Sequence, residues 1–221
     1  MDVIEAMKGR GSVRAFLEQP VKRETIEAIL DAARWAPSGV NTQPWQVKVV
    51  TGTLKQSVSE AIISARYAGI EPHSDYHYYP KQWSEPYKAR RVKCGIALYK
   101  ALEIKREDTE RRKEVWERNY RFFDAPVGLF FFIDDYLEKG SWMDVGMFLQ
   151  NVMLAARGVG LETCSQAALA EYPDIVRQHL GVEESKQLIC GMALGYADWD
   201  APINQYRTER EDVSTFTEFY F

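Results

Sequence analysis

Two arginines and a serine near the start of the chain have the types and the spacing to bind a phosphate group. Arg10, Ser12 and Arg14 alternate in the segment RGSVR, directly after Gly9. If this segment is extended, alternate side chains point to one side and surround a dianion with two guanidinium groups and a hydroxyl. Cations are also common at a helix C-terminus, where they offset the helix dipole. The segment alone leaves both the phosphate clamp and the helix end open.

A second segment, PSGVNTQPW at residues 37–45, carries more hydrogen-bonding side chains than a connecting loop needs. Asn41 and Gln43 each offer amide donors and acceptors, which suit the pyrimidine edge of an isoalloxazine ring or the hydroxyls of a ribityl chain. A helix end followed by an Asx turn uses the same residue types. The loop is therefore either a binding loop or an ordinary connection made of a helix end and an Asx turn.

The elements that must position these segments can be predicted from periodicity. The spacing of apolar residues predicts helices at 2–8, 22–35, 54–67, 87–102, 107–120, 141–158 and 172–180. Runs of β-branched and aromatic residues predict strands at 45–50, 127–133 and 187–196, with one further segment at 161–168. No internal repeat or linker interrupts the order. The fold class is α+β, with helices packed about a central sheet in a single domain that spans residues 1–221.

One strand and the helix after it are predicted in more detail. The segment VGLFFFI, residues 127–133, is apolar throughout, so we expect a central strand that is buried on both faces. The following helix is expected to begin near Ser141, whose side chain would form a capping box with Asp144. Gly158 is expected to end it.

Two segments are rich in aromatic residues but show no regular pattern. Three prolines and four rings lie between residues 68 and 86, which predicts a loop or lid inside an insert of about 68–120. The C-terminal arm, about 199–221, places four rings in its last six residues. Burying one phenylalanine stabilises a protein by about 1.5–3 kcal/mol, so we expect the arm to dock on a surface. That surface belongs either to a partner subunit or to the arm's own subunit.

Charge and composition argue against several classes of partner. The chain has 28 basic and 32 acidic side chains and a formal net charge of −4, which would repel a nucleic acid or an anionic membrane. Three separated cysteines and the absence of a leader pattern at the N-terminus predict a cytoplasmic protein. The longest apolar run, residues 127–133, is too short to cross a membrane.

Three other sequence features could be mistaken for a metal site, a dinucleotide-binding motif and a redox-active thiol. His73 and His77 have helical spacing, but prolines flank them and no third ligand is near, so no metal site is expected. The sequence GVG at 158–160 follows a helix rather than a strand and is interpreted as a helix end. Cys164 has neither a thiol partner nor an adjacent base and is expected to be buried and inert.

Taken together, the two N-terminal segments resemble a known family. RGSVRAF and APSGVNTQPW, separated by one helix, are similar to the N-terminal signature of the FMN-dependent nitroreductase family. Three later segments extend the resemblance over essentially the whole chain: FFDAPVGLFFFID, GMFLQNVMLAARGVGLETCSQAALA, and CGMALGYAD with N-x-x-R at 204–207. The aromatic insert and the sequence GLETCSQAA make the chain most similar to the branch that includes nitrobenzoate reductases.

The resemblance implies a central mixed sheet, an intertwined homodimer, and FMN bound at the dimer interface. The residues it assigns to the cofactor are Arg10, Ser12, Arg14, Ser38, Asn41, Gln43, Ser165, Gln166, Ala167 and Arg207. Among these, Arg10, Ser12 and Arg207 match the positions that hold the flavin phosphate, and Arg14 matches a cation near the O2/N1 edge. A turn at 165–167 matches the backbone donor that faces N5.

Two departures from the family pattern affect these assignments. Gly11 stands where the family commonly has a basic residue or a histidine, so a second cationic contact is not expected there. The insert at 68–120 leaves the ribityl-binding asparagine of the family without a matching position.

The implied activity needs no catalytic side chain, because the flavin carries the chemistry. NADH or NADPH would reduce the flavin at N5 and leave before an acceptor such as a nitroaromatic takes its place, which is a ping-pong sequence. The rings of the insert, Trp83 among them, are expected to cover a planar acceptor. Lys88, Arg90 or Arg91 could pair with a carboxylate on that acceptor, and Arg91 is the residue assigned to it. Two alternatives stay open. The first is a flavin enzyme whose natural substrate is not a nitro compound, with a quinone, an enone or a dehydrogenase reaction in its place. The second is a flavin-binding redox sensor with low turnover.

Overall fold

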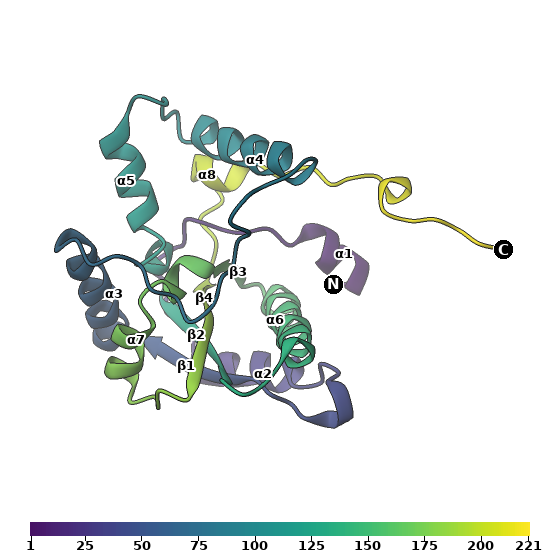
Figure 1. The fold of residues 1–221 in the computed structure, drawn as a ribbon, viewed down its shortest axis with the longest axis horizontal. Helices are drawn as coiled ribbons and strands as arrows, with labels where there is room; N and C mark the ends of the chain where they lie inside the picture. The colour runs from purple at the N-terminus through teal and green to yellow at the C-terminus, as the bar shows by residue number, and fades with distance from the viewer.

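A four-stranded sheet forms the centre of the protein in a computed structural model that describes residues 1–221 (Figure 1). The strands are β1 (Gln46–Thr51), β2 (Val127–Asp134), β3 (Glu162–Gln166) and β4 (Lys186–Gly195). Their order in the sheet is β1-β2-β4-β3, and each neighbouring pair is antiparallel.

The expectation of a mixed sheet is therefore wrong for this chain, in which all three strand pairs run antiparallel. Strand β2 is central and buried, as predicted. A wholly apolar strand is typical of parallel sheets because helices cover both of their faces. In this protein helices cover both faces of an antiparallel sheet, so the same residue pattern arises without parallel pairing.

Alternate residues of β2 enter two different cores. Phe130 and Phe132 pack in one cluster with Ile62 of α3 (Gly52–Tyr67) and with residues of α7 (Pro173–Leu180). Leu129 and Phe131 pack in the other with residues of α2 (Arg23–Ala33) and α6 (Lys139–Gly158). Figure 1 shows these two pairs of helices on opposite sides of the sheet. The sheet thus lies between two helical layers.

Helix α6 begins earlier than its sequence signals predict. It starts at Lys139, so Ser141 lies within its first turn, and the position before the helix is Glu138, which makes no side-chain cap. The carboxylate of Asp144 instead accepts a hydrogen bond from the backbone N–H of Gly39 at 3.1 Å. The predicted capping box is thus incorrect, because Asp144 binds another loop.

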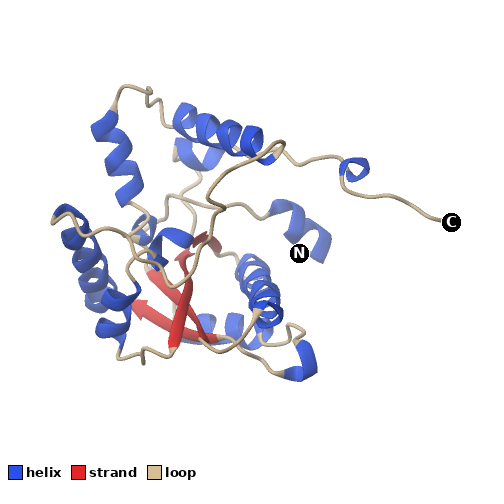
Figure 2. Cartoon of the chain, viewed as in Figure 1, coloured by secondary structure: helices blue, strands red, loops and turns tan.

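The remaining helices lie outside the two core layers. They are α1 (Val3–Gly9), α4 (Tyr87–Ala101), α5 (Thr109–Glu117) and the short α8 (Pro202–Gln205), which periodicity did not predict. Neither α4 nor α5 has a buried residue. A long loop without regular structure joins α3 to α4 and crosses the molecule (Figure 2). None of the helices combines the length and the apolar character needed to span a membrane.

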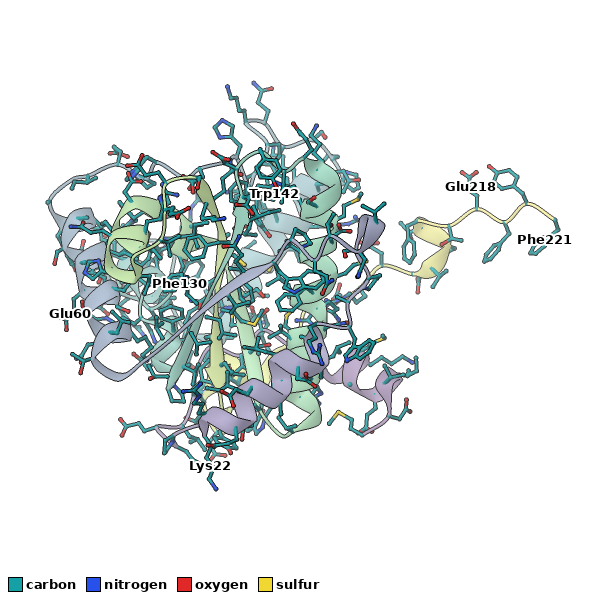
Figure 3. The ribbon with its side chains drawn as sticks, turned by 90° about the horizontal axis from the view of Figure 1, so that it is seen from below. Lys22, Glu60, Phe130, Trp142, Glu218 and Phe221 are labelled. Atoms are coloured by element: carbon teal, nitrogen blue, oxygen red, sulfur yellow. The ribbon has the colours of Figure 1, made fainter.

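The end of the chain projects away from the rest of the molecule. Glu218 and Phe221 lie well outside the body that contains Phe130 and Trp142 (Figure 3). Phe216, Phe219, Tyr220 and Phe221 are all exposed. The alternative that the arm folds back on its own subunit is thus not what this chain does. Its base is attached to α4, where Arg90 Nε lies 2.8 Å from Glu211 Oε1.

Candidate functional site

The segment that follows α1 is extended. Arg10 occupies the C-cap of α1 with φ −57° and ψ 133°, and its N–H still donates to the carbonyl of Ala6. Beyond it, Val13 N–H donates to Thr163 O at 3.1 Å on β3, and Leu17 N–H donates to Tyr196 O at 2.9 Å after β4. Both interpretations of RGSVR therefore apply in part: the first arginine ends a helix, and the residues after it are extended.

Asn204 joins this segment to the C-terminal part of the chain. Its Oδ1 accepts from the N–H of Arg14 at 2.8 Å, and its Nδ2 donates to the carbonyls of Ala15 at 2.8 Å and Asp198 at 2.7 Å. An amide that is bonded through both its oxygen and its nitrogen holds these two segments of backbone together. The N-x-x-R motif contains this residue, but sequence reasoning assigned a function only to Arg207.

Arg207 lies against the end of α1. Its Nη2 donates to the carbonyls of Lys8 at 2.7 Å and Arg10 at 3.0 Å. A cation at this position offsets the negative end of the helix dipole. The contact also brings the Arg207 guanidinium beside the RGSVR segment.

A cavity of about 730 Å³ lies between these two ends of the chain. Its lining includes Arg10, Arg14, Arg207 and Arg210 but no aspartate or glutamate. None of these four guanidinium groups forms an ion pair with a carboxylate within 4.0 Å. Burial, followed by the charges of Arg210 and Arg207, lowers the pKa of Arg10. The cavity has an excess of positive charge that an anion would relieve.

Ser12, Arg14 and Gly11 of RGSVR have distinct surroundings. The carbonyl of Ser12 accepts from Arg14 Nη1 at 3.2 Å, and the same guanidinium lies 3.5 Å from Tyr206 Oη and 6.0 Å from the ring centroid of Phe123. Gly11 borders open space, since a Cβ at this position would meet no atom within 4 Å. Donors of this kind around an open space fit a phosphate monoester.

The segment 165–167 is the end of strand β3 and the start of a short 3-10 helix, rather than the expected turn. Ser165 Oγ lies 3.6 Å from Met153 Sδ, and Arg10 Nη1 lies 3.9 Å from the same sulfur, so Ser165 is near the cavity. Gln166 is 3% exposed and donates to Asn119 O at 2.7 Å, which gives its side chain a structural role. The backbone continues to Ala167, where the 3-10 helix begins.

The binding loop at 38–43 does not line the cationic cavity. Ser38 Oγ accepts from the N–H of Gln43 at 3.0 Å, and Gln43 Nε2 donates to Asn41 O at 3.2 Å. Val40, Asn41 and Gln43 all have positive φ, and Val40 is 97% exposed. A β-branched residue in the left-handed region is strained, and such strain is common at binding sites. One chain alone therefore does not bring this loop to Arg10, Ser12 and Arg14.

Trp83 and Arg91, predicted to contact an acceptor, are brought together. The Arg91 guanidinium carbon lies 5.4 Å from the centroid of the Trp83 ring. This is a cation–π contact, and Arg91 has no ion-pair partner. Tyr79 lies 5.6 Å from the Trp83 ring. A planar, cationic surface of this kind suits an aromatic molecule that carries a negative charge.

Cys164 lies on β3, close to Ser12 and Arg14. It is 2% exposed, and burial raises the pKa of its thiol. A protonated, buried thiol is a poor nucleophile, in line with the prediction that this cysteine is inert.

Comparisons with known proteins agree on one family. The model of the "Nitroreductase family" matches residues 7–196. The chain is 41% identical over 219 residues to a 4-nitrobenzoate reductase of Pseudomonas putida, covering 99% of this chain and 95% of the relative. It is 39% identical over 218 residues to a nitrobenzene nitroreductase of Ectopseudomonas oleovorans, covering 97% of this chain and 95% of the relative. The crystal structure of the FMN and NADPH-dependent nitroreductase NfnB from Sphigopyxis sp. strain HMH superposes with a TM-score of 0.97, at 38% identity and 100% coverage of both chains.

Proposed function

This chain belongs to the nitroreductase family, and we propose that it is an FMN-dependent oxidoreductase that passes electrons from NADH or NADPH to small organic acceptors such as nitroaromatics. The observation that carries this proposal is the cavity whose four guanidinium groups have no carboxylate partner. FMN ends in a phosphate dianion, which this set of donors would bind and neutralise. When bound, FMN accepts two electrons from the nicotinamide and gives them to the acceptor.

The roles of the chain's own residues follow from their contacts. Arg10, Ser12 and Arg207 would hold the phosphate, since they surround the end of the cavity where α1 stops. Tyr206 and Phe123 keep Arg14 in place, where its charge would stabilise negative charge at the pyrimidine end of the ring system. The backbone at 165–167, beside Arg10, is the proposed donor toward N5.

We propose a homodimer, because the remaining cofactor residues need a second subunit. Ser38, Asn41 and Gln43 lie on a strained, outward-facing loop that does not line the cavity of its own chain. Exposed apolar side chains elsewhere support an interface, including Met143 and Met147 of α6 and the rings of the C-terminal arm. Burial of such a surface against a second copy would stabilise it.

The insert at about 68–120 is proposed as the acceptor-binding part of a single domain, with residues about 199–221 as the arm that reaches the partner. The Trp83 ring would stack on the acceptor, and Arg91 would pair with a carboxylate on it. This arrangement favours nitroaromatics that carry a carboxylate, such as nitrobenzoates. Three free thiols, none in a disulfide, suit the cytoplasmic location that we propose.

The function is tested with purified protein and a panel of acceptors. Anaerobic NADPH or NADH should bleach the yellow colour of the bound flavin, and a nitroaromatic should restore it. Double-reciprocal plots at several acceptor concentrations should be parallel, as ping-pong kinetics require. Protein that binds no flavin, or binds only FAD, would overturn the proposal. Bleaching by the nicotinamide with recovery by quinones alone would instead indicate a non-nitro substrate.

A further inference from the structure

Strand β4 contains a bulge at Ile189. In the pairing of β2 with β4, Phe131 lies opposite Cys190 and Phe132 lies opposite Leu188, so Ile189 has no opposite residue. A bulge of this kind interrupts the ladder and leaves backbone groups to be satisfied in another way.

Two consecutive residues of the long loop bind the backbone at this bulge. Asp75 Oδ2 accepts a hydrogen bond from the N–H of Leu188 at 2.9 Å. The hydroxyl of Tyr76 donates to the carbonyl of Ile189. The loop side chains thus take the place of ladder partners, and the loop begins from a fixed point on the central sheet.

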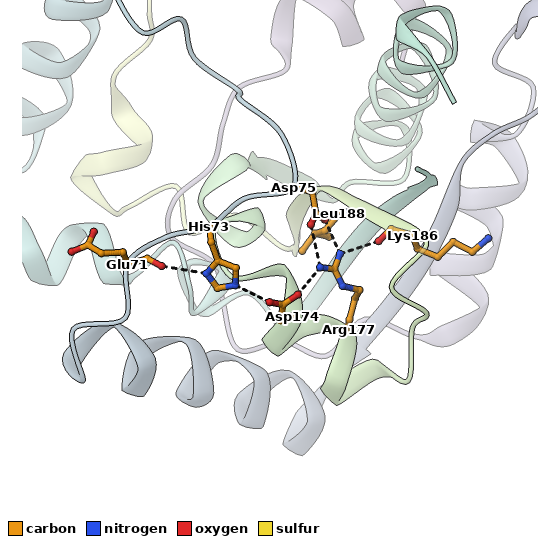
Figure 4. Close-up of polar contacts among 7 residues, drawn as sticks. All are labelled: Glu71, His73, Asp75, Asp174, Arg177, Lys186 and Leu188. Carbon is orange, nitrogen blue, oxygen red and sulfur yellow. Dashed lines mark hydrogen bonds and ion pairs between the residues drawn. The ribbon is translucent and has the colours of Figure 1, made fainter. Parts of the chain in front are cut away.

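Arg177 of α7 strengthens this attachment. Its Nη1 lies 2.7 Å from Asp75 Oδ2, and its Nη2 lies 3.1 Å from Asp75 Oδ1, so the pair is bidentate (Figure 4). The same guanidinium donates to Lys186 O at 3.0 Å and to Asp174 Oδ1 at 2.6 Å. Arg177 is 9% exposed. A buried ion pair in which the arginine makes two hydrogen bonds to one carboxylate holds that carboxylate more firmly than a surface ion pair does.

A further contact lies just before Asp75. His73 Nε2 lies 3.0 Å from Asp174 Oδ2, and the N–H of His73 donates to Glu171 O at 2.9 Å. We call residues 73–76 the loop root. The root is therefore bound to α7, to the turn before it and to β4 through both side chains and backbone.

The aromatic residues of the insert continue directly from the loop root. The Tyr76 ring lies 4.6 Å from the Trp142 ring of α6 and 6.4 Å from the Tyr78 ring. Tyr78 contacts Tyr79 at 4.6 Å, and Tyr79 contacts Trp83. This row of rings connects the loop root to the pair formed by Trp83 and Arg91. A displacement of the root would therefore displace the surface that we assign to the acceptor.

We propose that Asp75, Tyr76 and Arg177 are positioning residues that hold the aromatic row in its acceptor-binding arrangement. The proposal rests on the function proposed above, in which the row contacts the acceptor. Ordering a flexible loop costs conformational entropy, and an acceptor that had to order it would bind more weakly. Because the contacts at the bulge and with Arg177 already order the loop, the acceptor does not have to supply the free energy for this ordering. The nicotinamide step should depend less on the row than the acceptor step does.

Two variants test the proposal in the flavin-loaded protein. Tyr76→Phe removes one hydroxyl and keeps the ring on Trp142, and Asp75→Asn removes the charge that Arg177 holds. Lys186→Met is the matched control, because it breaks the ion pair of Lys186 with Asp134 at the same end of the sheet but keeps the backbone carbonyl that Arg177 uses. Stopped-flow absorbance measures flavin bleaching by NADPH and recovery by 4-nitrobenzoate separately. Trypsin cleavage after the exposed Lys81, assigned by mass spectrometry, reports the loop itself.

We expect both variants to impair the acceptor step more than the nicotinamide step. Tyr76→Phe should raise the acceptor KM about fivefold, the factor that one neutral hydrogen bond corresponds to. Asp75→Asn should raise it about tenfold or more because a charge-assisted pair is lost. Both should speed cleavage after Lys81, while bleaching by NADPH changes less than about twofold and Lys186→Met resembles the wild type.

Three outcomes would overturn the proposal. Equal effects of Tyr76→Phe and Asp75→Asn on both steps would show a general structural role. Unchanged acceptor KM in both variants would show that the root does not position the row. Unchanged cleavage after Lys81 would show that these contacts do not order the loop. If the wild-type flavin is not bleached by either nicotinamide, the proposed function itself fails, and the cleavage rates still test the attachment separately.

Discussion

The Nη2 atom of Arg207 lies 3.0 Å from the carbonyl oxygen of Arg10, although 197 residues separate them in the chain. The bond uses the backbone of Arg10 and leaves its guanidinium group without a carboxylate. Two positive charges are thus held close together with no carboxylate paired to either; burial, followed by the charges of Arg210 and Arg207, lowers the pKa of Arg10. Repulsion between such charges is relieved when an anion binds beside them, so the arrangement favours anion binding.

The first prediction concerns this charge. Purified protein should be yellow with noncovalent FMN, and Arg10→Ala should weaken FMN binding by about 2–3 kcal/mol, the range for losing a charge-assisted contact. The dissociation constant can be measured from the quenching of FMN fluorescence. Arg23→Ala is the control, because Arg23 is an exposed arginine paired with Glu27 on α2. An affinity loss below about tenfold would leave Arg10 only its role at the end of α1.

The second prediction concerns Asn204. Asn204→Ala removes the acceptor for the N–H of Arg14 and the donor for the carbonyls of Ala15 and Asp198. Leaving these partly buried groups without partners should lower the free energy of unfolding by about 1–3 kcal/mol and weaken FMN binding as well. Urea unfolding and flavin titration provide the two measurements. Gln205→Ala, which changes an exposed neighbour bonded only to Trp199 O, should have little effect on either quantity.

The third prediction concerns the C-terminal arm. Deletion of residues 212–221 removes the four exposed rings but keeps Glu211 and its contact with Arg90. We expect the dissociation constant of the proposed dimer to rise and flavin occupancy to fall with it, because the proposed interface would support both. Analytical ultracentrifugation and the absorbance ratio of flavin to protein provide the measurements. A truncated protein that stays dimeric and fully loaded at nanomolar concentration would contradict the role of the arm.

The fourth prediction separates the two acceptor contacts. Arg91→Gln should raise the KM for 4-nitrobenzoate about two- to fivefold, as expected for an exposed ion pair, and should leave the KM for nitrobenzene unchanged. Trp83→Leu should raise both values, because stacking does not depend on the carboxylate. The KM for the nicotinamide serves as the internal control in each variant. Parallel increases for both acceptors in Arg91→Gln would argue against a carboxylate contact.

The sequence alone determined most of the elements and the identity of the cationic segment. Periodicity within a helix or strand depends on neighbouring residues, so α2, α3, α4 and β2 appear within a few residues of their predicted bounds. The alternation of Arg10, Ser12 and Arg14 is likewise a local pattern, although the sequence leaves open whether the backbone after α1 is extended. The family resemblance added Arg207, which no local pattern marks as a partner of Arg10.

Only the tertiary structure decided how distant segments meet. Strand direction depends on the path of the connections and not on the residues of β2, so the antiparallel sheet could not be predicted from an apolar run. Asp144 carries a capping signal but binds Gly39, and Asn204 looks like a surface amide but joins segments 190 residues apart. The attachment of Asp75 to Arg177 and to the bulge in β4 has no sequence signal either. Hydrogen bonds of this kind form between groups that the fold brings together, and the residue types alone do not specify which partners those are.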